Sequence, residues 1–365
     1  MAYLKEKEQL ISKILRKPRL FTKEEETQAL NQLDFGNIRN LMKSIYDADE
    51  DSLREMSDAR KGSLAIPNKI AAKYRHKKYY RKVKAAHRVD NPKKANKVIL
   101  AEGDSWFQFP FLVKDIIRWL IEDRRNAIYS IAYAGDWLTN IIYDGEYISE
   151  LAVHQPDAFL ISGGGNDLLG NSRLAVMLKL PEQPSINPSD YVRERFYSYV
   201  LTLKLMYRMI FQNIRNRNQY DKMVIITQGY DYPIPRRPRF VLKRPFNYFL
   251  TKLIGSGQWL AEPMDIVGIP NKLKEQQDNE LRMDIIRYMI DSFNEMFIEV
   301  TEHFENVFHV DCRGLAKDEN DWFDEIHLRS KNFRKVSKVY SDIIHTRLGQ
   351  HEQKVYVVNS KKYDN

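Results

Sequence analysis

Cysteine is nearly absent from this 365-residue chain, which contains only Cys312. A single cysteine excludes any disulfide within the chain, as is typical of proteins from a reducing compartment. The sequence also lacks an uninterrupted apolar stretch long enough to span a bilayer, and its first residues lack the apolar core of a secretory signal. We therefore expect a cytoplasmic protein, and its charge leaves open a peripheral association with a membrane.

Patterns for binding metals and nucleotides are lacking too. The eight histidines show no metal-ligand spacing, and no cluster of acidic or cysteine ligands accompanies them. The glycines of Gly163–Gly165 are not followed by the lysine and hydroxyl residue of a phosphate-binding loop, nor by the spacing of a dinucleotide fingerprint. The sequence predicts neither a metal nor a cofactor.

Positive charge is concentrated in one segment. From Lys73 to Lys97 the chain has eleven lysines and arginines against one acid, Asp90, so the remainder is close to neutral although the net charge is +9. Three tyrosines lie among these cations: Tyr74, Tyr79 and Tyr80. Such a mixture suits nucleic acid, whose bases stack on rings, and equally an anionic membrane surface. A solvated helix face that binds nothing is the third interpretation.

The residues before this segment predict helices. One apolar stripe at helical spacing is formed by Leu10, Ile11, Ile14 and Leu15. Thr22 and Glu25 match a capping box, and the stretch from Phe35 to Tyr46 gives a third candidate helix. We expect residues 1–72 to be a helical N-terminal extension, a cap or a contact for a homo-oligomer, and residues 73–96 to be a basic linker.

From Lys97 onward, short apolar runs alternate with longer amphipathic stretches. The predicted strands are 97–102, 128–132, 157–162, 222–228 and 306–310. The predicted helices lie around 111–124, 136–153, 189–216, 273–304 and 331–347. This alternation is typical of a parallel sheet covered on both faces. We predict an α/β fold over residues 97–350: a three-layer α/β/α flavodoxin-like sandwich with a central parallel sheet of about five strands, followed by a tail, 351–365.

One segment exceeds what this fold requires. Residues 230–272 contain six prolines and an apolar cluster between Phe240 and Leu260. Long segments of this kind in compact domains are often lids or binding surfaces. The sequence is compatible with two interpretations of this segment: an insertion packed on the core, or a lid that faces a substrate.

Side chains suited to acyl transfer follow several predicted strands. Ser105 stands in Gly-Asp-Ser, Asn166 in Gly-Asn-Asp, and Asp324 precedes His327 by three residues. A serine hydroxyl needs a base within hydrogen-bond reach, and histidine suits this task because its ordinary pKa lies near neutrality. On a tight turn, the Asp324 carboxylate can reach the other ring nitrogen and orient the imidazole. We assign the neighbouring Asp104 and Asp167 to bracing their loops.

Together these residues resemble the SGNH hydrolase superfamily, the GDSL-type esterases and lipases, over roughly residues 97–350. The four residues that name the superfamily match in order: Ser105, Gly135 in Ala-Tyr-Ala-Gly-Asp-Trp, Asn166 and His327. The resemblance implies a catalytic triad of Ser105, Asp324 and His327. It also implies an oxyanion hole made by the backbone N–H groups of Ser105 and Gly135 and the amide of Asn166.

The resemblance predicts a serine esterase that hydrolyses carboxylic esters, of lipids or of small acyl groups, through an acyl-enzyme on Ser105. Trp106 stands where the family name has leucine, which leaves the substrate class open. One alternative is an O-acetyl-carbohydrate esterase. The other is a catalytically silent scaffold that binds a membrane or nucleic acid through residues 73–97.

Overall fold

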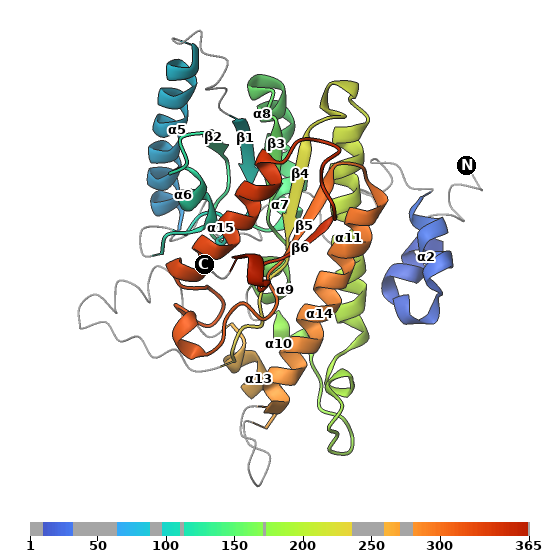
Figure 1. The fold of residues 1–365 in the computed structure, drawn as a ribbon. Coiled ribbons are helices and arrows are strands. Elements are labelled where there is room, and N and C mark those ends of the chain that lie inside the picture. Colours follow the sequence, from blue (N-terminus) through green and yellow to red (C-terminus); the bar gives the residue numbers. More distant parts are fainter. Residues whose placement is uncertain are drawn as a thin grey trace.

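A six-stranded, all-parallel sheet forms the centre of the molecule (Figure 1). The computed structural model describes residues 10–31, 64–87, 97–109, 113–170, 173–235, 259–270 and 280–363. The strands are β1 (Lys97–Glu102), β2 (Asn126–Ser130), β3 (Ala158–Ile161), β4 (Val224–Gln228), β5 (Val307–Asp311) and β6 (Val355–Val357). Their order is β2-β1-β3-β4-β5-β6, and helices cover both faces. The predicted flavodoxin-like three-layer α/β/α fold is confirmed.

The sixth strand was not predicted. It lies in residues 351–365, which the sequence suggested to be a tail, and it pairs with β5 from His309–Val355 to Asp311–Val357. Only three residues long and placed at the edge of the sheet, β6 lacks the longer apolar run that marks the other strands. The last residues of the chain therefore extend the sheet.

Helices form a layer on each face of the sheet. One face is covered by α7 (Leu138–Asp144), α8 (Glu146–His154), α11 (Glu194–Arg215) and α14 (Glu280–His303). The other is covered by α6 (Ile116–Leu120) and α15 (Ser330–His345). Successive residues of β1 alternate between the two cores, since Leu100 belongs to the first and Ile99 and Ala101 to the second. The predicted helix over 136–153 is two helices, because Gly145 adopts a left-handed conformation between them.

Three of the four residues of the predicted N-terminal stripe pack within the chain, whereas Leu10 is exposed. Residues 10–16 are helical, and Ile11, Ile14 and Leu15 are buried in the core formed by α11 and α14. After η1 (Pro18–Leu20), the helix α2 (Lys23–Leu30) begins at the predicted capping box, in which Thr22 and Glu25 each accept a hydrogen bond from the other's backbone N–H. The third candidate, around residues 35–46, lies outside the described residues.

Most of the segment expected to be a basic linker is a helix that packs on the sheet. The long helix α5 (Ala65–His87) lies against β2, the edge strand at one end of the sheet (Figure 1). The linker prediction for 73–96 is therefore wrong over 73–87, and residues 88–96 lie outside the described residues. The prediction failed because it treated all the cations as exposed, whereas some of them face inward.

Arg75 and Lys82 are the inward-facing cations of α5. The Arg75 guanidinium donates to the Asp115 carboxylate and to the Phe107 carbonyl, each at 2.6 Å, and its burial lowers its pKa. The Lys82 ammonium donates to the carbonyl groups of Ile121, Asp123 and Asn126. These contacts fasten α5 along the edge of the sheet and cover an edge that would otherwise be open to pairing.

One histidine is buried on the strand next to the edge strand β6. His309 on β5 is fully buried, with Nδ1 3.0 Å from the Thr227 hydroxyl and Nε2 3.3 Å from Oδ1 of Asn294. Its ring stacks on Phe297 at 5.1 Å, and burial lowers its pKa to about 3. The imidazole is therefore neutral in the folded protein, donating from Nε2 and accepting at Nδ1.

We predict that His309 makes the fold sensitive to acid. The unfolded chain binds a proton at this histidine below about pH 6.5, whereas the folded chain does so only near pH 3. Stability should therefore fall by about 1.4 kcal/mol per pH unit as pH drops through this window. Urea unfolding of the wild type and His309→Gln at pH 6.5, 5.5 and 4.5 measures the difference in slope. Equal slopes would contradict the assignment.

Candidate active site

Ser105 lies at the point in the sheet where the strand order reverses. The chain runs from β1 outward to β2 and then returns to β3 on the other side of β1, so a crevice is expected beyond the carboxyl ends of β1 and β3. Ser105 follows β1, and Asn166 follows β3 in the first turn of α9 (Gly165–Leu169). The sharp turn before the serine requires glycine: at Gly103 φ is +154°, and an added Cβ would lie 2.5 Å from the carbonyl oxygen of Ser162.

The three predicted triad residues form one hydrogen-bonded chain. His327 Nε2 lies 2.6 Å from Ser105 Oγ, and His327 Nδ1 lies 2.7 and 2.9 Å from the two carboxylate oxygens of Asp324. A ring nitrogen facing a carboxylate carries the hydrogen, so Nε2 is left to accept from the serine hydroxyl. Asp324 also accepts the backbone N–H groups of Ile326 and His327, which fixes the turn between acid and base.

The histidine loop is fastened to the serine loop and is flanked by aromatic rings. The Trp106 indole donates to the carbonyl of Ile326 at 3.2 Å. The rings of Phe109 and Trp259 meet the imidazole edge to face, with centroids at 4.6 and 5.9 Å. His327 is only 4% exposed, so these contacts hold it in one orientation away from bulk water.

The described ends of the 230–272 insertion belong to the site. Trp259 contacts His327, and the Glu325 carboxylate accepts the backbone N–H groups of Leu260 and Ala261, each at 2.8 Å. The helix α13 (Ala261–Val267) follows directly. Residues 236–258 and 271–272 lie outside the described residues, so the lid interpretation for the middle of the segment stays a prediction.

Asn166 lies beside the glycine expected in the oxyanion hole. Its Nδ2 donates to the carbonyl of Asp136 at 2.8 Å, in the turn that contains Gly135 with φ +82°. The same turn is held from the other side by Asn68 of α5, whose side chain donates to the carbonyl of Ala134 and accepts its N–H. The N-terminal helix thus supports the turn that bears Gly135, and no motif in the sequence pointed to Asn68.

Two buried aspartates brace the loops, as predicted. Asp104 accepts the N–H of Trp106 at 3.0 Å, the hydroxyl of Ser162 at 2.9 Å, and the hydroxyl of Tyr230. Asp167 accepts the backbone N–H groups of Leu138 and Thr139 at the start of α7. Burial raises the pKa of both carboxyl groups, which the donated hydrogen bonds oppose.

Tyr230, like Asn68, supports the site although no motif in the sequence pointed to it. Its hydroxyl donates to Asp104 beside the serine and accepts the N–H of Gly165 beside Asn166 at 3.2 Å. Its ring meets Trp106 edge to face at 5.1 Å. This one side chain therefore ties the serine loop to the asparagine loop, a contact between positions too far apart in the sequence to be recognised there.

A pocket with a largely apolar lining opens beside the serine. Ser105 and Asn166 lie in its wall together with Tyr230. The apolar lining includes Leu168, Leu174, Phe196, Ile286, Met289 and Phe293. These side chains come from α9, α10 (Leu174–Met177), α11 and α14, so the pocket extends from the serine toward one helical layer. Its lining has the chemistry of a site for an apolar group.

The structure brings the predicted site residues close to one another. Ser105, Asp324 and His327 are hydrogen-bonded to one another, and Asn166 shares a pocket with Ser105. Gly135 lies in the turn that Asn166 contacts. Within the described ranges, no three histidine, cysteine, aspartate or glutamate side chains are grouped to hold a metal ion, and no helix is long and apolar enough to cross a membrane.

No model of a known protein family matches the chain, and no curated protein matches its sequence. What the site does is therefore inferred from its residues and geometry.

We predict that Gly103→Ala destabilises the fold by about 1–3 kcal/mol, because the new Cβ forces the serine loop away from Ser162. Gly349→Ala is the matched control, since φ is also positive there, at +80°, but nothing lies within 4 Å of the added Cβ. Urea unfolding compares the two variants. Equal losses would mean that backbone conformation alone, and not the contact with Ser162, requires glycine at position 103.

Proposed function

We propose that the protein is an SGNH-type serine esterase that hydrolyses carboxylic esters through an acyl-enzyme on Ser105. The observation that carries the proposal is the hydrogen-bonded chain from Asp324 through His327 to Ser105, with contacts of 2.7 and 2.6 Å. Three side chains from two distant parts of the sequence meet in the order that activates a serine.

The proposed acylation step uses each member of the chain. His327 Nε2 takes the proton from the Ser105 hydroxyl as Oγ attacks the ester carbonyl carbon. Asp324 holds the ring and stabilises the imidazolium that forms. The bond to the leaving alcohol then breaks, and His327 returns the proton to the alcohol oxygen. Water, deprotonated by the same histidine, then attacks the acyl carbon, the bond to Ser105 Oγ breaks, and His327 returns the proton to Oγ as the acid leaves.

The negative charge on the carbonyl oxygen needs preorganised donors. The proposed donors are the backbone N–H groups of Ser105 and Gly135 and the side-chain amide of Asn166. One hydrogen of this amide is donated to Asp136, which orients the group, and the second is the one proposed to reach the oxyanion. A donor of this kind contributes about 2.7–4 kcal/mol to transition-state stabilisation.

The pocket beside Ser105 favours esters with an apolar acyl chain. Its wall is formed mainly by leucine, isoleucine, methionine and phenylalanine side chains, which a hydrocarbon chain can contact without leaving polar groups unpaired. An O-acetyl-carbohydrate esterase would need polar side chains for the sugar, and this wall offers few. We therefore propose acyl esters ahead of acetylated carbohydrates.

The first prediction of the proposal concerns the nucleophile. A fluorophosphonate should label the wild type and fail to label Ser105→Ala, and the same variant should lose hydrolysis of p-nitrophenyl butyrate by at least a thousandfold. Ser162→Ala is the matched control: its hydroxyl donates to Asp104 rather than to His327, so labelling should persist. Labelling of Ser105→Ala to the same extent as the wild type would overturn the proposal.

The second prediction concerns chain length. Each methylene buried in the pocket contributes about 0.8 kcal/mol, so kcat/KM should rise roughly fourfold per carbon from acetyl toward longer p-nitrophenyl esters. Met289→Trp fills part of the pocket. It should lower kcat/KM for the longer esters and leave kcat/KM for the acetyl ester unchanged. A preference for acetyl in the wild type, unaffected by Met289→Trp, would contradict an acyl pocket.

A further inference from the structure

Helix α5 presents two chemically different faces. The inward face is anchored to the domain by Asn68, Arg75 and Lys82, as described above. Tyr79 adds a hydrogen bond between its hydroxyl and Nδ1 of His154 at 2.9 Å. These contacts span four turns of the helix and fix which face of α5 turns inward, and side chains on the opposite face are exposed.

The outward face combines aliphatic, aromatic and cationic side chains. At 100° per residue, eight positions between Ala65 and Val83 of α5 fall within one arc of about 140°. Four of them are large apolar or aromatic residues with exposed fractions of 72, 51, 54 and 49%: Ile66, Ile70, Tyr74 and Tyr80. The other four are exposed cations: Lys69, Lys73, Lys77 and Arg81. No acidic residue occurs anywhere in the helix. Within the described part of the chain, these four cations have no ion-pair partner.

We propose that this outward face of α5 docks on an anionic membrane surface. Cations on a rigid, acid-free face are complementary to phosphate and carboxylate head groups. The isoleucines distinguish lipid from nucleic acid, because bases stack on rings but gain little from aliphatic side chains, whereas the acyl boundary of a bilayer accepts both. Tyrosine side chains suit the same interface, with an apolar ring and a polar tip.

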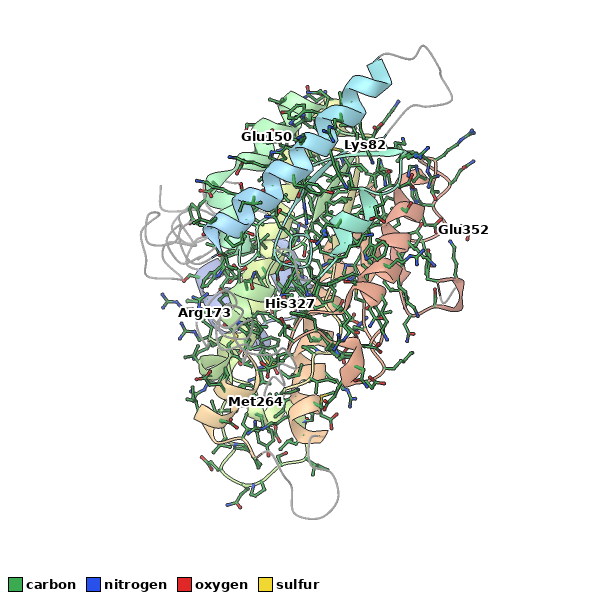
Figure 2. The ribbon with its side chains drawn as sticks, turned by 90° about the vertical axis from the view of Figure 1, so that its left-hand side faces the viewer. Lys82, Glu150, Arg173, Met264, His327 and Glu352 are labelled. Atoms are coloured by element: carbon green, nitrogen blue, oxygen red, sulfur yellow. The ribbon has the colours of Figure 1, made fainter. Side chains whose placement is uncertain are left out.

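The face has a direction relative to the candidate site. Ile66 and Ile70 lie at the end of α5 where Asn68 holds the turn before Gly135. Lys82 lies near the other end, and Figure 2, which looks onto α5, labels it above His327. The aliphatic end of the face is therefore the end of α5 nearer the turn that bears Gly135. The docking proposal does not depend on the proposed esterase activity.

Co-sedimentation of the full chain with vesicles tests the proposal. Phosphatidylcholine vesicles with 30% phosphatidylserine should bind the protein at 50 mM NaCl, pure phosphatidylcholine vesicles should not, and 300 mM NaCl should weaken binding at least tenfold. Lys69→Glu, Lys73→Glu, Lys77→Glu and Arg81→Glu combined should lower the affinity at least a hundredfold, since each cation contributes about fivefold.

Two further variants keep the result interpretable. Ile66→Asn with Ile70→Asn leaves every cation in place and should weaken binding about tenfold or more if the aliphatic end enters the interface. The matched control reverses four exposed cations elsewhere: Lys13, Lys17, Lys222 and Arg347. It should bind at least ten times more tightly than the α5 variant.

Thermal melts of each variant establish that it is folded. The proposal is overturned by absent binding to the anionic vesicles, by equal losses in the control and the α5 variant, or by full binding in the isoleucine variant. It is also overturned if single-stranded DNA binds at 50 mM NaCl while the vesicles do not. Because sedimentation does not depend on catalysis, a failure here is separate from a failure of the esterase proposal.

Discussion

The hydrogen bond between Ser105 Oγ and His327 Nε2 joins residues 222 positions apart, and much of the fold holds these two atoms together. The serine follows the end of β1, where only glycine at position 103 lets the backbone lie this close to Ser162. The histidine stands on a loop after β5 that Asp324 closes and Trp106 fastens to the serine loop. A parallel sheet makes this meeting possible, because the carboxyl ends of all its strands lie at one edge.

The region before the sheet supports the site as well. The sequence suggested a linker over 73–96, yet α5 covers the edge strand and reaches the site through Asn68. Its buried Arg75 meets Asp115, which also accepts the N–H of Phe109 in the chain after the serine. One helix therefore has two tasks, since its inward face positions the loops of the candidate site while its outward face stays available for the proposed docking.

The strands and the candidate site residues Ser105, Asp324 and His327 could be predicted because their signals are local. Each of β1 to β5 contains an apolar run, Ser105 and Asn166 stand in short motifs behind such runs, and Asp324 precedes His327 by three residues. Tyr230 and Asn68 could not be predicted, because a hydroxyl that bridges two loops and an amide that holds a distant turn leave no trace in neighbouring residues. The two faces of α5 were missed for a similar reason, since charge counted along the chain does not show which cations turn inward.

The central claim is that Asp324 and His327 act as one unit on Ser105, and a double-mutant cycle tests it most directly. Rates of p-nitrophenyl butyrate hydrolysis would be measured for His327→Ala, Asp324→Ala and the double variant. If the residues form one hydrogen-bonded chain, His327→Ala should lower kcat by several orders of magnitude, and adding Asp324→Ala should change it little further. Fully multiplicative losses, or an unchanged rate in His327→Ala, would contradict the account.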